Sequence, residues 1–186
     1  MLTFAFGCAA TLQPAPLDTA QDTGALTSRT DDSGHTIQTT TLDATDHEQW
    51  LYLDLSTGAL QDATEPGWDL AVQRYTLALR GGLIGEGDVL AVSLGEADFD
   101  TLTEAPLSGY ETDRPDEDGD GTDEYVLGDW YDYAPDTHVL TPAGVTYVVA
   151  TPDGHHRLQI LDYYNAAGTS GHPTIQWGAI DAPATE

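Results

Sequence analysis

The sequence predicts an all-β fold: a single, mostly antiparallel β domain, built as a sandwich or an open barrel, with a flexible N-terminal tether. Three observations predict this class. Short apolar or alternating runs follow one another from about residue 35 to residue 180. Glycine, proline or aspartate bounds the runs, as turn residues do. Helical periodicity is not sustained beyond two turns, and only residues 97–102 give a weak indication of a helix.

The expected strands are short and enriched in β-branched or aromatic residues, which suit a pleated, half-buried surface. They span residues 36–42, 50–55, 68–80, 89–94, 125–133, 145–150, 157–164 and 174–180. The run over residues 68–80 is the longest of them. No internal repeat is visible, so we expect one domain.

The best-specified element is a hairpin between residues 145–150 and 157–164. The sequence Thr151-Pro152-Asp153-Gly154 lies between its strands. Proline at the second turn position presets φ, and glycine permits the left-handed conformation of a bulged loop. Its apolar residues Tyr147, Val149, Leu158 and Ile160 place this hairpin at the centre of the expected core.

The same patterns divide the chain into parts. Residues 1–8 are expected to be a truncated lipoprotein signal. Residues 9–34 are rich in Thr, Asp, Ala and Pro and are expected to be a flexible linker. Residues 35–181 form the β domain, and residues 182–186 form a tail.

The charge of the chain is extreme. Its 186 residues include 32 acidic and 5 basic side chains, and the formal net charge is -27. Such a surface repels phosphate backbones, which argues strongly against nucleic acid as a partner. No apolar run approaches the roughly 20 residues that a membrane-spanning helix needs. Most of the acidic residues are scattered and are expected to be solvated.

The chain has one cysteine, Cys8, so it cannot form an internal disulfide. Cys8 follows an apolar stretch that ends in the small residue Gly7, and bacterial lipoprotein signals end in this way. The stretch is short and lacks a basic region, which an upstream start codon would explain. We expect Cys8 to be lipidated and the protein to be exported, to the outer membrane or cell surface, with the periplasm or secretion as alternatives.

An acidic loop over residues 116–124 carries the pattern Asp-x-Asp-x-Asp-Gly. Carboxylates at alternate positions of a tight loop converge on one point, and Ca²⁺ takes six to eight oxygen ligands. Position twelve of the loop is Leu127 instead of a bidentate Glu, so this is not an EF-hand. The expected calcium ligands are Asp116, Asp118, Asp120, Asp123 and Glu124. The alternative is a solvated acidic hairpin tip.

Catalytic motifs are missing from the sequence. It has no Gly-x-Ser-x-Gly elbow, no phosphate-binding loop with a lysine, and no histidine spacing typical of a metal site. We therefore expect a binding protein and not an enzyme. His138 and His172 lie in loops, where either could be an axial haem ligand or a surface residue.

The order of the aromatic segments resembles the HmuY family of bacterial haem-binding lipoproteins, over nearly all of residues 36–181. The resemblance is carried by a strand at Trp50, by Trp68-Asp69-Leu70-Ala71-x-x-Arg74-Tyr75, by a Gly-rich loop over 81–87, by Gly109-Tyr110, by Trp130-Tyr131-x-Tyr133, and by Tyr147-Val148-Val149 through Asp153-Gly154 to Gln159-Ile160-x-x-Tyr163-Tyr164. It implies an all-β fold, an N-terminal lipid anchor, and capture of haem for hand-over to an outer-membrane receptor.

The resemblance also implies two iron-binding histidines, in loops on either side of the Trp130 strand. Here the segment before that strand has carboxylates and no histidine, and after it His138 lies three positions beyond Pro135. The ligand pair is therefore not retained. The candidate haem residues are His138, His172, Tyr131, Tyr133 and Arg74, with Arg74 offsetting the propionates. The alternative function is a calcium-stabilised β surface module that binds a protein or a glycan and has no haem site.

Overall fold

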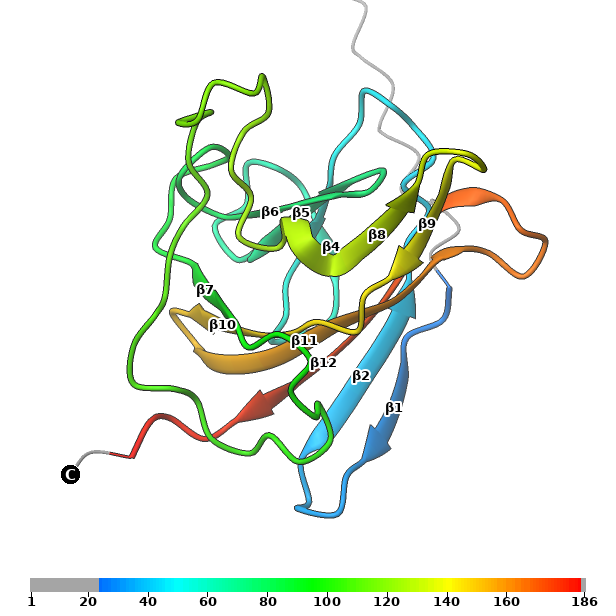
Figure 1. The fold of residues 1–186 in the computed structure, drawn as a ribbon. Helices are drawn as coiled ribbons and strands as arrows, with labels where there is room; N and C mark the ends of the chain where they lie inside the picture. Colours follow the sequence, from blue (N-terminus) through cyan, green and yellow to red (C-terminus); the bar gives the residue numbers. More distant parts are fainter. Residues whose placement is uncertain (1–23, 185–186) are drawn as a thin grey trace, which may run out of the picture.

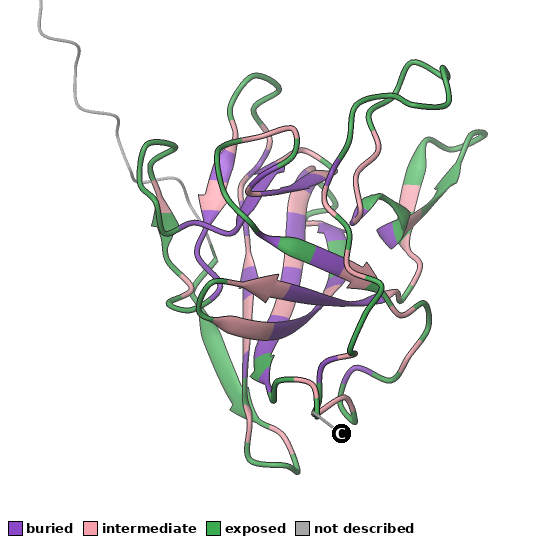
Figure 2. Cartoon of the chain, turned by 90° about the vertical axis from the view of Figure 1, so that its left-hand side faces the viewer, coloured by how far each residue is buried: buried purple, intermediate pink, exposed green. Residues whose placement is uncertain are grey.

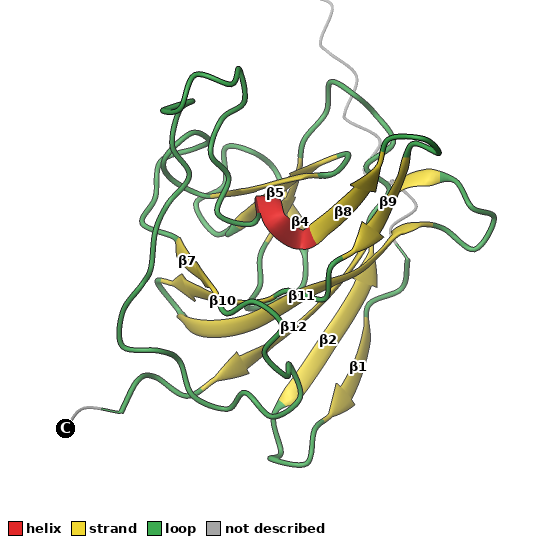
Figure 3. Cartoon of the chain, in the orientation of Figure 1, coloured by secondary structure: helices red, strands yellow, loops and turns green. Residues whose placement is uncertain are grey.

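The structure is a computed structural model that describes residues 24–184, and it confirms the all-β prediction (Figures 1 and 3). The strands are β1 (Thr27–Thr30), β2 (Thr36–Thr41), β3 (Leu51–Leu53), β4 (Leu60–Gln61), β5 (Leu70–Gln73), β6 (Thr76–Leu79), β7 (Leu90–Ser93), β8 (Tyr131–Ala134), β9 (Val139–Pro142), β10 (Thr146–Thr151), β11 (Gly154–Tyr164) and β12 (Ser170–Ile180). A short 3₁₀ helix, η1 (Gly128–Trp130), precedes β8. None of the helices in residues 24–184 has the length and apolar character to cross a membrane.

The strands form two antiparallel sheets and a separate hairpin. One sheet has six strands in the order β1-β2-β12-β11-β10-β7, and the other has four in the order β4-β3-β5-β6. The β8–β9 hairpin pairs only with itself. β11 and β12 are the longest strands, and they lie next to each other in the middle of the six-stranded sheet.

A shared hydrophobic core joins the two sheets. Leu53, Val72 and Leu77 of the four-stranded sheet belong to the same buried cluster as Leu158 and Trp177 of the six-stranded sheet. Buried residues accordingly concentrate in the middle of the molecule (Figure 2). Of the two architectures that the sequence left open, the structure therefore favours two sheets packed over one core.

The hairpin predicted around Pro152 is confirmed. β10 and β11 pair in antiparallel register, with Thr151 opposite Gly154, so that Pro152 and Asp153 form the turn. Gly154 has a φ of 145°, which favours glycine. The predicted core residues Tyr147, Val149, Leu158 and Ile160 are all buried in the shared core.

Two strand predictions need correction, and two strands were not predicted. The run over residues 68–80 is a hairpin, β5–β6, because Arg74 and Tyr75 form a two-residue turn between Gln73 and Thr76. No glycine, proline, asparagine or aspartate occurs in residues 73–76, so no typical turn residue marks it. The segment over residues 125–133 becomes a strand only after η1. The sequence did not predict β4, which has two residues, or β9, which ends in a proline.

The predicted linker over residues 9–34 is wrong at its C-terminal end. Residues Thr27–Thr30 form β1 and pair with β2 at the edge of the six-stranded sheet. All four residues of β1 are exposed, so the strand carries no hydrophobic periodicity that the sequence could have revealed. It forms because its backbone completes the hydrogen bonds of β2. Residues 1–23, including Cys8, lie outside the described part of the chain.

A buried arginine holds the loop over residues 97–105 against the six-stranded sheet. Arg157 of β11 is fully buried, and its Nη1 donates hydrogen bonds to the carbonyls of Phe99, Asp100 and Leu102 at 2.8, 3.1 and 2.9 Å. Its Nη2 donates to the carboxylate of Asp31, which lowers the pKa of that carboxyl. The weak helix indication over residues 97–102 is therefore wrong, because the carbonyls that a helix would use internally bind Arg157.

Asp69, in the Trp68-Asp69 motif, joins β5 to the loop after β3. It is 3% exposed, and its Oδ2 accepts a hydrogen bond from the backbone N–H of Leu55 at 2.9 Å. Burial raises the pKa of Asp69 to about 6, and the neighbouring carboxylates of Asp54 and Asp153 add to the shift. The folded protein thus holds this proton more tightly than the unfolded chain, where the ordinary value of 3.8 applies.

We predict that Asp69→Asn stabilises the protein at pH 8. The stability that the raised pKa provides is present at about pH 4 and is lost as the pH rises through about 6, which amounts to at most roughly 3 kcal/mol. Asparagine carries no charge and can still accept the Leu55 hydrogen bond. Urea unfolding should show Asp69→Asn more stable than wild type at about pH 8, with the difference shrinking towards about pH 4.5.

The control for this prediction is Asp62→Asn, which neutralises an exposed aspartate. Its stability difference from wild type should stay constant between the two pH values. A difference for Asp69→Asn that is equally independent of pH would contradict the role assigned to burial.

Candidate functional site

Aromatic side chains gather where the β5–β6 turn, η1 and the C-terminal end of β11 meet. We call them the aromatic rim; its members are Tyr75, Trp130, Tyr131, Tyr163 and Tyr164. Ring centroids lie 5.9 Å apart for Tyr75 and Tyr131, 6.5 Å for Tyr75 and Tyr163, and 6.0 Å for Trp130 and Tyr163. Trp130 is 1% exposed and Tyr75 is 48% exposed, so the rim extends from the core to the surface.

Arg74 stands beside the aromatic rim in a strained backbone conformation. Its φ is 54°, at the first position of a two-residue turn that usually takes glycine or asparagine. Nη1 donates to the carbonyl of Thr45 at 3.3 Å and Nη2 donates to Oγ of Ser170 at 3.2 Å. The guanidinium lies 5.9 Å from the centroid of the Tyr163 ring. Its charge lowers the pKa of Tyr163, against the larger raising effect of burial.

Arg74 has no carboxylate partner among the described residues. The chain has no lysine, and three of its five arginines, Arg29, Arg114 and Arg157, form ion pairs with aspartate or glutamate. The fourth, Arg80, lies over Trp68. A guanidinium has five N–H donors, so the two hydrogen bonds of Arg74 leave others for an anionic ligand.

Gly171, the second residue of β12, leaves room for the Arg74 side chain. A Cβ on Gly171 would lie 2.4 Å from Nη1 of Arg74 and 3.1 Å from Cα of Thr45. The next residue is His172, whose Nδ1 lies 3.1 Å from the carbonyl of Thr169 and whose Nε2 lies 3.9 Å from the Asp43 carboxylate. The sequence placed His172 in a loop, but it is the third residue of β12, and its ring nitrogens already face the Thr169 carbonyl and the Asp43 carboxylate.

The β8–β9 hairpin carries the remaining candidate haem residues. Tyr131 and Tyr133 alternate along β8 and so lie on one face, with Tyr131 in the aromatic rim. The hydroxyl of Tyr133 lies 2.5 Å from Nδ1 of His138 across the hairpin loop. His138 has a φ of 57°, and among residues 24–184 only it and Arg74 combine a side chain with a positive φ.

The five candidate haem residues thus come from separate segments to the same end of the domain. In Figure 1 the β8–β9 hairpin and the β11–β12 loop both project to the right of the molecule. A backbone N–H of β9, that of Leu140, donates to the Tyr164 hydroxyl at 3.0 Å and ties this hairpin to β11. Sequence reasoning missed Tyr75, Tyr163 and Ser170, because nothing in their spacing shows that turns far apart in the chain meet.

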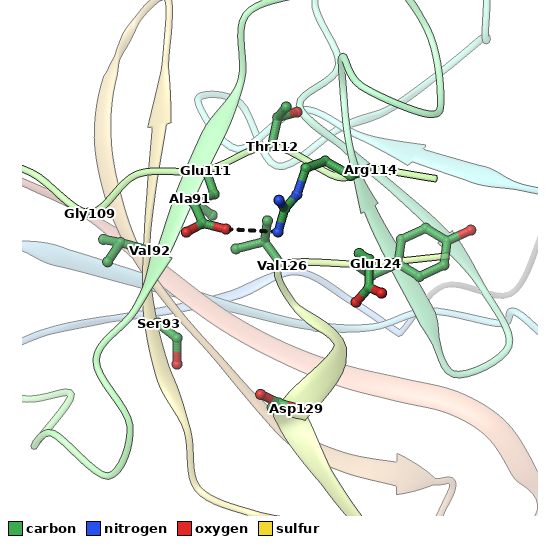
Figure 4. A pocket seen from close by; sticks show the side chains of 11 residues that line it. Ala91, Val92, Ser93, Gly109, Glu111, Thr112, Arg114, Glu124, Val126 and Asp129 are labelled. Atoms are coloured by element: carbon green, nitrogen blue, oxygen red, sulfur yellow. Dashed lines mark hydrogen bonds and ion pairs between the residues drawn. The ribbon is translucent and has the colours of Figure 1, made fainter. Parts of the chain in front are cut away.

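Two acidic cavities lie beside η1, and Asp129 lines both of them. One, of about 320 Å³, is lined by Tyr75 and Tyr131 and by the carboxylates of Asp123, Glu124 and Asp129, with no basic residue. The other, of about 340 Å³, has Arg114 as its basic residue, and Figure 4 shows that arginine paired with a carboxylate of the same cavity. Both cavities therefore repel anions, and a dianionic ligand would turn its carboxylates towards Arg74.

The acidic loop brings three of its carboxylates together. One oxygen from each of Asp116, Asp118 and Asp120 lies within 4.8 Å of the others, and all three residues are exposed. The Asp116 carboxylate accepts hydrogen bonds from the N–H groups of Gly119 and Gly121, at 2.7 and 2.9 Å. Exposed acidic loops adopt such arrangements without a metal, so the calcium site stays a prediction.

The two predicted closing ligands lie apart from that cluster. Oδ1 of Asp123 accepts a hydrogen bond from the backbone N–H of Asp116 at 3.2 Å. The backbone of Glu124 pairs with that of Arg114, and its side chain lines both acidic cavities.

Comparison with known proteins gives the chain its relatives. A family model described as HmuY protein matches residues 46–177. The chain belongs to the HmuY family. The resemblance inferred from the aromatic segments is thereby confirmed, although no curated protein sequence matches the chain.

Solved structures share the HmuY-family fold. A Bacteroides vulgatus protein described as HmuY-like and haem-binding is 24% identical over 80% of this chain and 94% of its own, with a TM-score of 0.58. The apo HmuY analogue of Tannerella forsythia is 18% identical over 84% and 97%, with a TM-score of 0.60. A Bacteroides fragilis protein described as a lipoprotein is 19% identical over 76% and 89%, with a TM-score of 0.57. At these identities the likeness shows the fold.

The site residues of this HmuY-family chain fit haem. Haem presents a flat aromatic ring, two carboxylates and an iron atom. The half-exposed ring of Tyr75 and the partly exposed ring of Tyr131 offer aromatic surface, and Arg74 offers an unpaired cation. The Tyr133–His138 pair offers oxygen and nitrogen donors at the surface.

We predict that Gly171→Ala displaces Arg74 and lowers stability more than Gly168→Ala does. Both glycines have a positive φ, 85° and 78°, which costs an alanine about 1 to 2 kcal/mol. Only the alanine at 171 meets Arg74, because nothing lies within 4 Å of a Cβ at 168. Urea unfolding of both variants measures the difference.

Repeating the pair in an Arg74→Gln background identifies the cause. Most of the excess cost of Gly171→Ala should disappear there, because the clashing guanidinium is gone. An undiminished excess would show that the contact with Thr45 dominates, and that Gly171 does not serve to position Arg74.

Proposed function

We propose that this protein is a non-enzymatic, exported lipoprotein that binds haem and passes it to a receptor in the outer membrane. Membership of the HmuY family supports the general class. The single observation that carries the proposal for this chain is Arg74, a strained and unpaired cation beside exposed aromatic rings in a protein of net charge -27.

The backbone conformation of Arg74 costs free energy, and this cost supports a functional role for the residue. A positive φ in a residue with a side chain is uncommon, and such strain persists only where the surroundings enforce it. Hydrogen bonds to Thr45 and Ser170 and the space at Gly171 all act to hold this guanidinium in place. In a molecule this acidic, an arginine without a carboxylate partner is the group most able to attract a haem propionate.

The rest of the site complements that contact. Tyr75 and Tyr131 present rings at the surface for the flat face of the ligand. The acidic cavity that Tyr75 and Tyr131 line repels the propionates and so favours an orientation in which they face Arg74. Haem, as cargo, supplies an iron that needs axial ligands, and the side chains on the β8–β9 hairpin can donate to it.

We predict that the protein binds ferric haem with a shift of the Soret band, and that Arg74→Gln weakens binding about tenfold or more. Loss of a charge-assisted hydrogen bond has an effect of this size. Absorbance titration of the full chain with haem measures both quantities.

Arg80→Gln is the matched control. It removes the other arginine that lacks an ion pair with a carboxylate, and Arg80 packs on Trp68, outside the aromatic rim. Its affinity for haem should stay within about twofold of wild type. Absence of any Soret shift in the wild type would refute the proposed function, and equal weakening by both variants would refute the specific role of Arg74.

Export rests on Cys8. A single lipidated cysteine at the end of an apolar stretch would anchor the protein by acyl chains. We predict that, in an outer-membrane-bearing bacterial host, the chain expressed behind a complete lipoprotein signal fractionates with membranes. Cys8→Ser should move it to the soluble fraction. Wild type and variant in the same fraction would contradict lipidation at Cys8.

A further inference from the structure

A tyrosine and a histidine form a close polar pair at the tip of the β8–β9 hairpin. The hydroxyl of Tyr133 lies 2.5 Å from Nδ1 of His138, and Tyr133 is 51% exposed. His138 reaches this position with a φ of 57°, at the last residue of the loop, where its N–H donates to the Ala134 carbonyl at 2.8 Å. The hairpin therefore holds an exposed phenol oxygen against an imidazole nitrogen.

We propose that Tyr133 supplies the oxygen that binds ferric haem iron, with His138 as the positioning residue that accepts the phenol proton. This inference rests on the proposed function and names the iron ligand within it. The family resemblance implies two histidines on either side of the Trp130 strand, and this chain lacks that pair. Its replacement is an oxygen donor on the strand itself.

The chemistry follows from the pair. A phenol is ordinarily protonated at neutral pH and is then a weak ligand, whereas a phenolate is a good ligand for ferric haem iron. Nδ1 of His138, 2.5 Å from the Tyr133 hydroxyl, would take up the proton that the phenol gives up on binding iron, and would then hold the phenolate through the same hydrogen bond. Partners of this kind orient a ligand and tune it, and their loss typically weakens metal binding 10- to 100-fold.

The place of Tyr133 in the fold suits this role. It lies on the same face of β8 as Tyr131 and directly opposite Leu140 of β9, which packs on the core. Tyr133 is therefore the next aromatic residue along β8 after Tyr131 of the aromatic rim. On the other side of the rim, the Arg74 guanidinium lies 5.9 Å from the centroid of the Tyr163 ring. A single ligand of the size of haem has an anion contact and an iron donor available at one end of the domain.

The competing donors near this end are less available. The partly buried ring of Tyr131 makes edge contacts with the rings of Tyr75 and Trp130. His172 has Nδ1 next to the Thr169 carbonyl and Nε2 near Asn165 and Asp43, and its side chain is 15% exposed. His47 is exposed in the loop that follows Thr45, and it is the histidine that the experiment must separate from Tyr133.

The experiment is a titration of the full chain with ferric haem, read by absorbance for affinity and by resonance Raman and EPR spectroscopy for the iron ligand. The wild type should show the iron–phenolate vibrations and the high-spin ferric signal of tyrosinate ligation. Tyr133→Phe should lose both and bind about tenfold or more weakly. His138→Gly, which adopts the positive φ without strain, should keep the phenolate signature and bind 10- to 100-fold more weakly.

Tyr52→Phe is the matched control, because Tyr52 packs on Trp68 outside the aromatic rim, and the change removes a phenol oxygen and keeps the ring. It should leave the phenolate signature unchanged. Thermal unfolding of the haem-free variants checks that each is folded. His47→Ala should likewise leave the spectrum unchanged.

Different failures have different meanings. A wild type that binds haem without the phenolate signature, or a Tyr133→Phe variant that retains it, overturns the inference and leaves the proposed function standing. Loss of the iron-ligand spectrum in His47→Ala, or its loss in His138→Gly without any phenolate signature in the wild type, assigns a histidine ligand and also overturns it. A wild type that does not bind haem overturns both.

Discussion

Two buried tryptophans fix how the layers of this protein meet, and the candidate site depends on that fit. The indole N–H of Trp177, in the six-stranded sheet, donates to the Leu55 carbonyl beyond β3 at 2.8 Å. The indole N–H of Trp130 donates to the Tyr75 carbonyl in the β5–β6 turn at 2.9 Å. Each bond satisfies a buried donor with an acceptor from a different part of the fold, so sliding one layer past the other would leave both groups unpaired at a cost of about 1 to 3 kcal/mol each.

The second of these contacts sets the geometry of the rim. Trp130 holds the β5–β6 turn from one side, and Arg74 in the same turn is held from the other side by Thr45 and Ser170. The turn is therefore held between η1 on one side and Thr45 and the start of β12 on the other. This explains how Arg74 can sustain a conformation that usually requires glycine. Strain, an unpaired charge and exposed aromatic rings coincide at one place, and a binding site is the simplest common reason for them.

The charge distribution distinguishes this end of the molecule from the rest of the surface. Most of the protein repels anions, and the cavities beside Tyr75 and Tyr125 do so strongly because their lining is acidic. Arg157, the most deeply buried cation, is occupied by Asp31 and three backbone carbonyls and contributes structure. Arg74 is the exception at this acidic end, because its charge has no carboxylate partner in the described part of the chain. An anionic ligand that also has a large apolar face is favoured there, because stacking and the single cation act together against the general repulsion.

By itself the sequence determined the fold class, the family and the hairpin around Pro152, because these depend on local alternation, turn residues and the order of aromatic segments. Only the tertiary structure decided that residues 68–80 turn back at Arg74, that exposed β1 joins the sheet, and that Tyr75, Tyr133, Tyr163 and Ser170 belong to one end. These features arise from contacts between segments far apart in the chain, such as Arg74 with Ser170. Spacing along a sequence specifies which face of a strand a residue occupies, but it does not specify which distant turn that face will meet.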